Sequence, residues 1–193
     1  MANDWEYWSH FEARGTINDR LDYRVSPEFR FKDNFTDHYY SHLEFMLNWR
    51  VNSWCTLSPS YRHIQSLPGI DWITEQRPQL DLTLKWKMIS MVGSDRNRME
   101  SRIRGKNTAY RYRNKLTFNL PKLRVMSTQP FFANEFFYDF EAREINKNRV
   151  YAGLDLTLLK SVKCSLQYIL ESSLKSDTWN NTNVLGTTLK YTF

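Results

Sequence analysis

The sequence predicts an all-β protein, a single antiparallel up-and-down transmembrane β-barrel that spans residues 1–193 as one domain. The main observation is a repeated alternation of apolar and polar residues, which suits a strand with two different faces and does not suit a helix. A composition of 41% hydrophobic and 16% aromatic residues excludes a disordered chain. No segment approaches the roughly 20 consecutive apolar residues of a membrane-spanning helix.

The expected strands follow one another along the whole chain. The clearest is Leu21–Lys32, where every odd position except Pro27 is apolar and every even position is polar. About eleven segments share this period, two of them (5–17 and 55–63) more weakly. They are Trp5–Ile17, Leu21–Lys32, Tyr39–Val51, Cys55–His63, Leu80–Met88, Arg98–Arg104, Tyr110–Phe118, Phe132–Phe140, Arg149–Leu158, Val162–Leu170 and Asn183–Phe193.

The connections between these strands alternate in length. Short turn signals occur at Asn18-Asp19, Asn52-Ser53, Gly93-Ser94-Asp95 and Lys160-Ser161, and the longest connections are Ile64–Pro78, Glu141–Asn148 and Ser172–Asn181. This alternation is typical of an up-and-down barrel with longer loops at its outer end. A closed bacterial barrel with both chain ends in the periplasm needs an even number of strands. Twelve strands are therefore favoured, with a short or bulged strand in Lys122–Pro130, and ten are the fallback.

Alternation alone does not say which face points inward. A soluble lipocalin-like ligand-binding barrel places the apolar set inside, whereas an outer-membrane barrel places it outside. Strands of about 10 to 13 residues favour the membrane, because ~9 to 11 tilted residues cross a bilayer. Aromatic residues near strand ends, such as Trp5, Tyr39 and Tyr191, suit the two membrane interfaces. The soluble barrel remains an alternative.

The final residues carry the pattern Gly186-x-x-Leu189-x-Tyr191-x-Phe193. It resembles the signal that the bacterial outer-membrane assembly machinery recognises, although Val184 stands where a polar residue is common. The expected partners are therefore this machinery during biogenesis, and outer-membrane lipid and lipopolysaccharide afterwards. The first residues contain no secretory signal, so we expect a mature form located in the bacterial outer membrane.

Motifs in the middle of the chain point to a family. They are Arg96-Asn97-Arg98-Met99-Glu100-Ser101-Arg102, Tyr110-Arg111-Tyr112-Arg113-Asn114-Lys115-Leu116, Glu135-Phe136-Phe137 and Asn148-Arg149-x-x-x-Gly153. Together they resemble the bacterial family catalogued as domain of unknown function 2490, over nearly the whole chain. The resemblance implies an outer-membrane β-barrel with its leader removed, and it implies no established activity and no catalytic residues.

If the apolar residues face lipid, the polar lumen is rich in Arg and Glu. Arg is permanently charged and bridges carboxylates bidentately, so we expect a cross-strand charge lattice. Its members are Arg30, Arg98, Glu100, Arg102, Arg111, Arg113, Glu135 and Arg149. The lattice either plugs and stiffens a structural barrel or leaves a narrow channel for small anionic solutes.

The alternative from another class is a rim-located outer-membrane hydrolase that acts on lipid or lipopolysaccharide. Its weak candidates are His38, His42 and Glu44, which alternation places on the polar face, whereas Ser41 falls on the opposite face. A Ser–His pair within this strand therefore needs a bulge. An enzyme is less favoured than a structural or transport barrel.

Other classes of ligand find little support. Four scattered histidines, together with Cys55 and Cys164, show no metal-ligand spacing, so neither a metal nor another cofactor is expected. The net charge of +6 would suit a phosphate-rich partner. Nucleic acid is not expected, however, because in a strand the tyrosines and arginines of residues 110–113 point to opposite faces.

Overall fold

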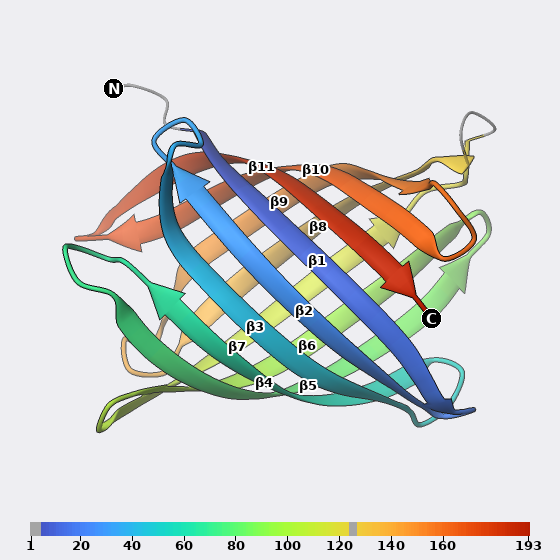
Figure 1. Cartoon of the computed structure of the whole chain (residues 1–193), viewed down its shortest axis with the longest axis horizontal. Coiled ribbons are helices and arrows are strands. Elements are labelled where there is room, and N and C mark those ends of the chain that lie inside the picture. The colour runs from blue at the N-terminus through green and yellow to red at the C-terminus, as the bar shows by residue number, and fades with distance from the viewer. Residues whose placement is uncertain (1–4, 124–126) are drawn as a thin grey trace.

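The computed structural model describes residues 5–123 and 127–193, which form one closed β-barrel (Figure 1). This confirms the predicted all-β, up-and-down architecture. The described residues contain β1 (Trp5–Asn18), β2 (Leu21–Lys32), β3 (Asp37–Arg50), β4 (Cys55–Ser66), β5 (Ile73–Met88), β6 (Met91–Arg104), β7 (Asn107–Asn119), β8 (Gln129–Asp139), β9 (Glu144–Thr157), β10 (Val162–Lys175) and β11 (Thr178–Thr192). Within the same residues, no helix has the length and apolar character to cross a membrane.

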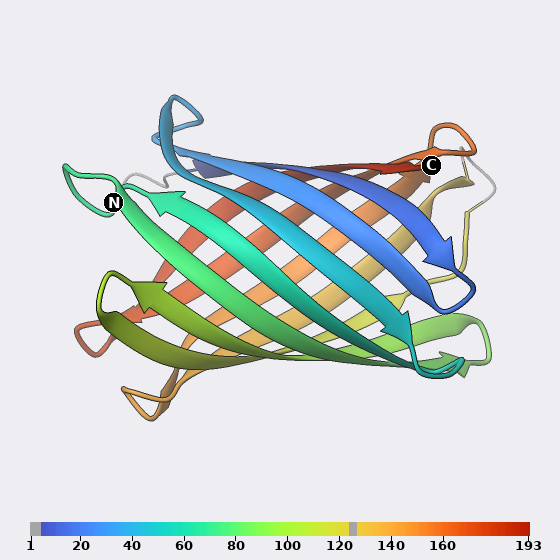
Figure 2. The same cartoon turned by 60° about the horizontal axis from the view of Figure 1, so that its bottom comes forward.

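The strand number differs from the prediction. The described residues form eleven strands, so the favoured 12 and the fallback of 10 are both wrong. With an odd number, the first and last strands run in the same direction, and β1 closes the barrel by pairing parallel with β11, from Trp5↔Asn183 to Arg14↔Thr192. The even-number argument assumed that both chain ends meet at one end of the barrel. Figures 1 and 2 show instead that β11 ends at the opposite end from the start of β1.

The described residues of Lys122–Pro130 do not form the extra strand. The last two begin β8, and Lys122, Leu123, Ser127 and Thr128 lie in the connection before it. The expectation for residues 124–126 lies outside the described residues. The Leu123 N–H donates to the Thr128 carbonyl at 2.8 Å, which closes this connection on itself.

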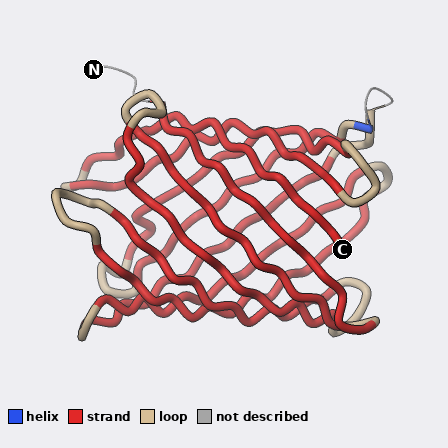
Figure 3. Tube along the Cα trace, viewed as in Figure 1, coloured by secondary structure: helices blue, strands red, loops and turns tan. Residues whose placement is uncertain are grey.

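The prediction of short turns at one end of the barrel and longer loops at the other is also wrong. Connections lie at both ends of the barrel (Figure 3), and the longest, residues 120–128, is at the end where short turns were expected. Gly93 lies inside β6, and the chain turns earlier, at residues 89–90. At the other end, β10 and β11 extend into the polar segment Ser172–Asn181 that was expected to be a loop. Only Ser176 and Asp177 therefore join these two strands. Both have positive φ, as a type I′ hairpin turn requires.

Polar and apolar residues occupy opposite faces of the barrel wall. On β3, for example, Phe45 is 49% exposed on the outside whereas Glu44 is 1% exposed inside. The same contrast runs around the barrel, because alternate residues of a strand point to opposite faces. A soluble calyx needs the reverse arrangement. Cys55 and Cys164 are free, partly buried thiols on the outward phase of their strands.

One part of the interior is apolar. Trp8, Ala133, Tyr151, Ile169 and Val184 are buried and pack together between β1 and β8–β11, with Phe131 against them. Because these strands form one side of the barrel, the apolar cluster fills that side. The buried charged side chains come mainly from β3 and β5 to β7, on the other side of the barrel.

The outer face also has a polar exception, on β6 and β7. Asn114 donates to Asp95 Oδ1 at 2.5 Å and to Asn97 Oδ1 at 3.2 Å, and the Tyr112 hydroxyl donates to the same Asn97 oxygen. Asn97 in turn donates to Asp95 at 3.2 Å. These groups satisfy one another, which lowers the cost of a polar patch on an otherwise apolar wall.

Candidate functional site in the barrel interior

Glu100 on β6 is the centre of one group of interior charges. Its side chain is completely buried, and Arg113 donates to Oε1 at 2.7 Å while Arg111 donates to Oε2 at 2.8 Å. Arg77 on β5 lies 3.7 Å from the same carboxylate. Cross-strand register produces this arrangement, because Glu100 faces Arg111 on the neighbouring strand.

Glu135 on β8 is the centre of a second group. Arg113 and Arg96 donate to Oε1 at 2.7 and 2.5 Å, and the Tyr151 hydroxyl donates to Oε2 at 2.6 Å. Arg113 therefore bridges Glu100 and Glu135, which joins the two groups. Each carboxylate accepts several charge-assisted hydrogen bonds, as a buried charge requires.

The remaining predicted lattice residues make their shortest contacts with other partners, although Arg149 also lies 3.9 Å from Glu135. Arg98 binds Asp81 bidentately at 2.6 and 2.7 Å and donates to Gln79 at 2.8 Å. Arg102 donates to Glu75, Arg30 to Glu28 and Arg149 to Glu171. Arg98 thus pairs with neither Glu100 nor Glu135.

Several members of the ion-pair network are absent from the predicted lattice. They include Arg62, Glu75, Arg77 and Glu171. The prediction of a loop at Ile64–Pro78 is wrong for residues 73–78, which belong to β5, where Glu75, Arg77, Gln79 and Asp81 occupy alternate positions of the strand. That alternation was the signal that could have found them.

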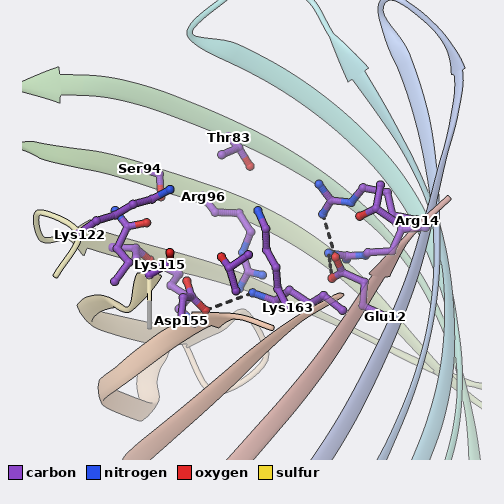
Figure 4. A pocket seen from close by; sticks show the side chains of 16 residues that line it. Glu12, Arg14, Thr83, Ser94, Arg96, Lys115, Lys122, Asp155 and Lys163 are labelled. Atoms are coloured by element: carbon purple, nitrogen blue, oxygen red, sulfur yellow. Dashed lines mark hydrogen bonds and ion pairs between the residues drawn. The ribbon is translucent and has the colours of Figure 1, made fainter. Parts of the chain in front are cut away.

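Among the cavities of the interior, three follow one another along the barrel and share lining residues. The C-terminal cavity, about 560 Å³, lies at the end where β11 finishes (Figure 4). It shares Arg24, Arg96 and Lys115 with the central cavity of about 310 Å³. The central cavity in turn shares Arg30 and Arg113 with a smaller cavity of about 120 Å³, here called the arginine cavity.

The charges around these cavities are unequal. The C-terminal cavity is lined by the cations Arg14, Arg24, Arg96, Lys115, Lys122, Lys163 and Lys190 and by two carboxylates, Glu12 and Asp155. The arginine cavity is lined by Arg30, Arg62, Arg77, Arg111, Arg113, Lys147 and Arg149, together with Tyr40 and Phe137. No carboxylate lines the arginine cavity within the described part of the chain, so its wall presents donors and positive charge to any occupant.

Between the cavities the interior is filled by ion pairs. Glu44, Arg98, Glu100 and Glu135 are each only 1% exposed. Glu44 accepts from Arg24 at 2.6 Å and from Arg62 Nε at 2.9 Å. Paired charged side chains therefore narrow the interior around the central cavity.

The candidate hydrolase residues His38, His42 and Glu44 do not lie together in one site. A register shift between Arg30 and Phe31 places His38 opposite Phe31, so the His38 ring lies against Phe31 and Trp72 on the outer face. The prediction that His38 shares the polar face is therefore wrong, because the bulge reverses the alternation. His42 and Glu44 remain inside, and Glu44 is occupied by two arginines.

The proposed assembly signal lies at the C-terminal end of the barrel. Leu189 and Tyr191 are 41% and 44% exposed on the outer face, whereas Gly186 is buried. The Phe193 N–H donates to the Arg14 carbonyl at 3.0 Å, which attaches the last residue to β1. The arrangement presents alternate apolar side chains outward.

No curated protein matches this chain. The chain is similar to the crystal structure of the siderophore receptor PirA from Pseudomonas aeruginosa with a TM-score of 0.36 and 14% sequence identity, over 88% of this chain and 36% of the receptor. This chain thus spans about a third of the receptor's length, and so distant a similarity carries no argument about function. A family model matches residues 5–182, nearly the whole chain, which confirms the resemblance drawn from the sequence. The chain belongs to the family described as protein of unknown function (DUF2490).

Proposed function

We propose that this protein is a bacterial outer-membrane β-barrel whose interior binds small anions and passes them through a narrow, low-conductance path. The arginine cavity carries the proposal, because seven cationic side chains and no carboxylate of the described chain line it. A small oxyanion held there would accept hydrogen bonds from several guanidinium groups at once.

The outer face supports insertion into a membrane. Large apolar side chains such as Leu43, Phe45 and Leu80 are about half exposed around the barrel. In water such a continuous apolar surface is unfavourable, whereas in a bilayer it contacts lipid chains. Strands of 11 to 16 residues are long enough to cross the hydrocarbon core at a tilt.

The cavity order supports a path rather than a single pocket. The C-terminal cavity is the largest and has an excess of cations, so it would concentrate anions at that end. The volumes decrease from about 560 through 310 to 120 Å³ toward the arginine cavity. Buried ion pairs then restrict the flow, which predicts small currents rather than porin-like ones.

Planar-bilayer recording tests the proposal. The refolded chain is first checked by gel mobility before and after boiling, and the reversal potential is then measured in a salt gradient. We expect a small conductance with anion selectivity. The double variant Lys122→Glu/Lys163→Glu changes the charge of the C-terminal cavity and should move the reversal potential toward zero.

Lys106→Glu is the matched control, because Lys106 lies in the exposed β6–β7 turn at the opposite end and lines none of the three cavities. It should leave selectivity unchanged. A folded, heat-modifiable barrel that stays silent would contradict the channel. The buried ion pairs would then favour the second candidate, a closed structural barrel stiffened by its charge lattice.

A further inference from the structure

A row of two histidines and one glutamate crosses three neighbouring strands inside the barrel. His10 on β1 faces Glu28 on β2, and Glu28 faces His42 on β3. One ligand atom of each residue lies within 4.8 Å of the others. We propose that His10, Glu28 and His42 form a binding site for a transition-metal dication, with Zn²⁺ as the expected occupant.

His42 provides an independent reason to expect a ligand. It is 5% exposed, and both of its ring nitrogens are buried without a hydrogen-bond partner in the described chain. Buried polar atoms are nearly always bonded, so an unpartnered imidazole needs an explanation. The ring centroids of Tyr40 and His10 lie 5.6 and 6.4 Å from the ring centroid of His42, so two rings flank the imidazole. A metal bond would satisfy a nitrogen that the protein leaves open.

Glu28 is oriented by a partner of its own. Arg30 Nε donates to Glu28 Oε1 at 2.5 Å, and the Arg30 guanidinium lies between the rings of Trp8 and Tyr40 at 3.8 and 4.3 Å from their centroids. Ligating carboxylates are commonly held by such outer hydrogen bonds. A carboxylate has two oxygens, so this contact still allows Glu28 to bind a metal.

Besides Arg30, which is paired with Glu28 itself, Arg24 and Arg62 lie near the row and are paired with other carboxylates. Arg24 Nη2 binds Glu44 Oε1 at 2.6 Å, and Arg62 Nε binds Glu44 Oε2 at 2.9 Å. Arg24 also lies 3.2 Å from Glu12. Pairing with carboxylates reduces the repulsion that these guanidinium groups would exert on a bound cation.

The donor set matches zinc chemistry. Two imidazoles and one carboxylate form a known type of zinc site that leaves one coordination position open, with bonds of about 2.0 to 2.2 Å. Ligand atoms around a tetrahedral ion lie about 3.4 Å apart at such bond lengths. The three ligand atoms lie within 4.8 Å of one another, so small side-chain rotations would bring them to bonding distance of one metal ion. His10 and Glu28 line the central cavity, so the open position would face that cavity. The site does not depend on the anion proposal.

Titration of the chain with ZnCl₂ tests the site. The untagged protein is refolded in detergent, freed of metal with a chelator, dialysed, and titrated in a calorimeter. We expect saturable binding of one Zn²⁺ per chain and a higher melting temperature with zinc. His42→Ala should weaken binding by at least about tenfold, since loss even of a supporting residue costs about 10- to 100-fold.

His63→Ala is the matched control, because His63 is an exposed histidine on the outward phase of β4 and is hydrogen-bonded to Gln76. It should bind zinc as the wild type does. His10→Ala provides a second ligand variant if His42→Ala does not refold, and gel mobility before and after boiling checks the fold of each. Absence of saturable binding to the folded wild type would overturn the proposal, as would an unchanged affinity in a folded His10→Ala protein.

Discussion

At the scale of single residues, the interior is held together by carboxylates that each bind more than one guanidinium. Glu100 binds Arg111 and Arg113, and Glu135 binds Arg96 and Arg113. Removing a charge from water costs several kcal/mol, and the partner charges must compensate for it. Loss of Glu100 therefore removes the ion-pair partner of Arg111 and weakens the charge compensation of Arg113, which keeps its contact with Glu135.

Glu100→Gln is expected to lower the free energy of unfolding by about 3 to 5 kcal/mol, because it removes the negative charge of a buried ion-pair group and leaves the arginines in place. Urea unfolding in detergent, followed by tryptophan fluorescence, measures the change. Glu141→Gln is the control, since Glu141 is exposed in the β8–β9 turn, and it should stay within about 0.5 kcal/mol of the wild type. Equal stability of the two variants would show that the buried pairs contribute little.

At the scale of strands, alternation determines where a segment is extended, but close contacts determine how neighbouring strands fit. Gly153 on β9 is an example, because a Cβ there would lie 2.6 Å from the Phe131 ring and 2.7 Å from the Leu166 carbonyl oxygen. The second contact is with backbone, which cannot rotate away. The bulge at Arg30 and Phe31 is another case, since it moves His38 to the outer face.

Gly153→Ala is expected to lower the free energy of unfolding by about 1 to 3 kcal/mol through overpacking. Gly69→Ala is the matched control, because no atom lies within 4 Å of the added Cβ and the substitution restricts the unfolded chain. The same urea titration compares them. A Gly153→Ala protein at least as stable as Gly69→Ala would mean that β8 and β10 move apart readily.

At the scale of the whole molecule, closure of eleven strands separates two environments. The outer wall is mostly apolar and includes the polar patch of Asp95, Asn97, Tyr112 and Asn114, whereas the inside is mostly charged apart from the cluster around Trp8. The proposed membrane location fits this division, because an apolar outer face is favourable in lipid and buried charges need compensation inside. This division predicts that a charged side chain introduced on the outer face lowers the free energy of unfolding only when the barrel lies in a bilayer.

Leu80→Arg is expected to destabilise the barrel in phosphatidylcholine vesicles by about 2 to 4 kcal/mol, because Leu80 is half exposed near the middle of β5. Urea unfolding in the vesicles measures the effect. Leu159→Arg, in the exposed β9–β10 turn, is the control and should cost at most about 1 kcal/mol. If both variants behave alike, the wall does not contact the hydrocarbon core.

The sequence by itself determined the class of fold, the approximate strands and the family. Segments such as Leu21–Lys32 carry this information locally, because the side-chain period of two does not depend on distant residues. Alternation also placed lattice members such as Arg98 and Glu100 on one face of the sheet. It could not predict which residues form ion pairs with one another.

Only the tertiary structure decided the strand number, the parallel closure of β1 on β11, and the partners of each charge. It also brought His10, Glu28 and His42 into one row across three strands, although no spacing along the chain suggested a metal site. The physical reason is that register and closure depend on hydrogen bonds between strands, and a bulge of one residue reverses the faces locally. A local pattern therefore predicts the two faces of the wall, whereas the contents of each cavity follow from how the strands align.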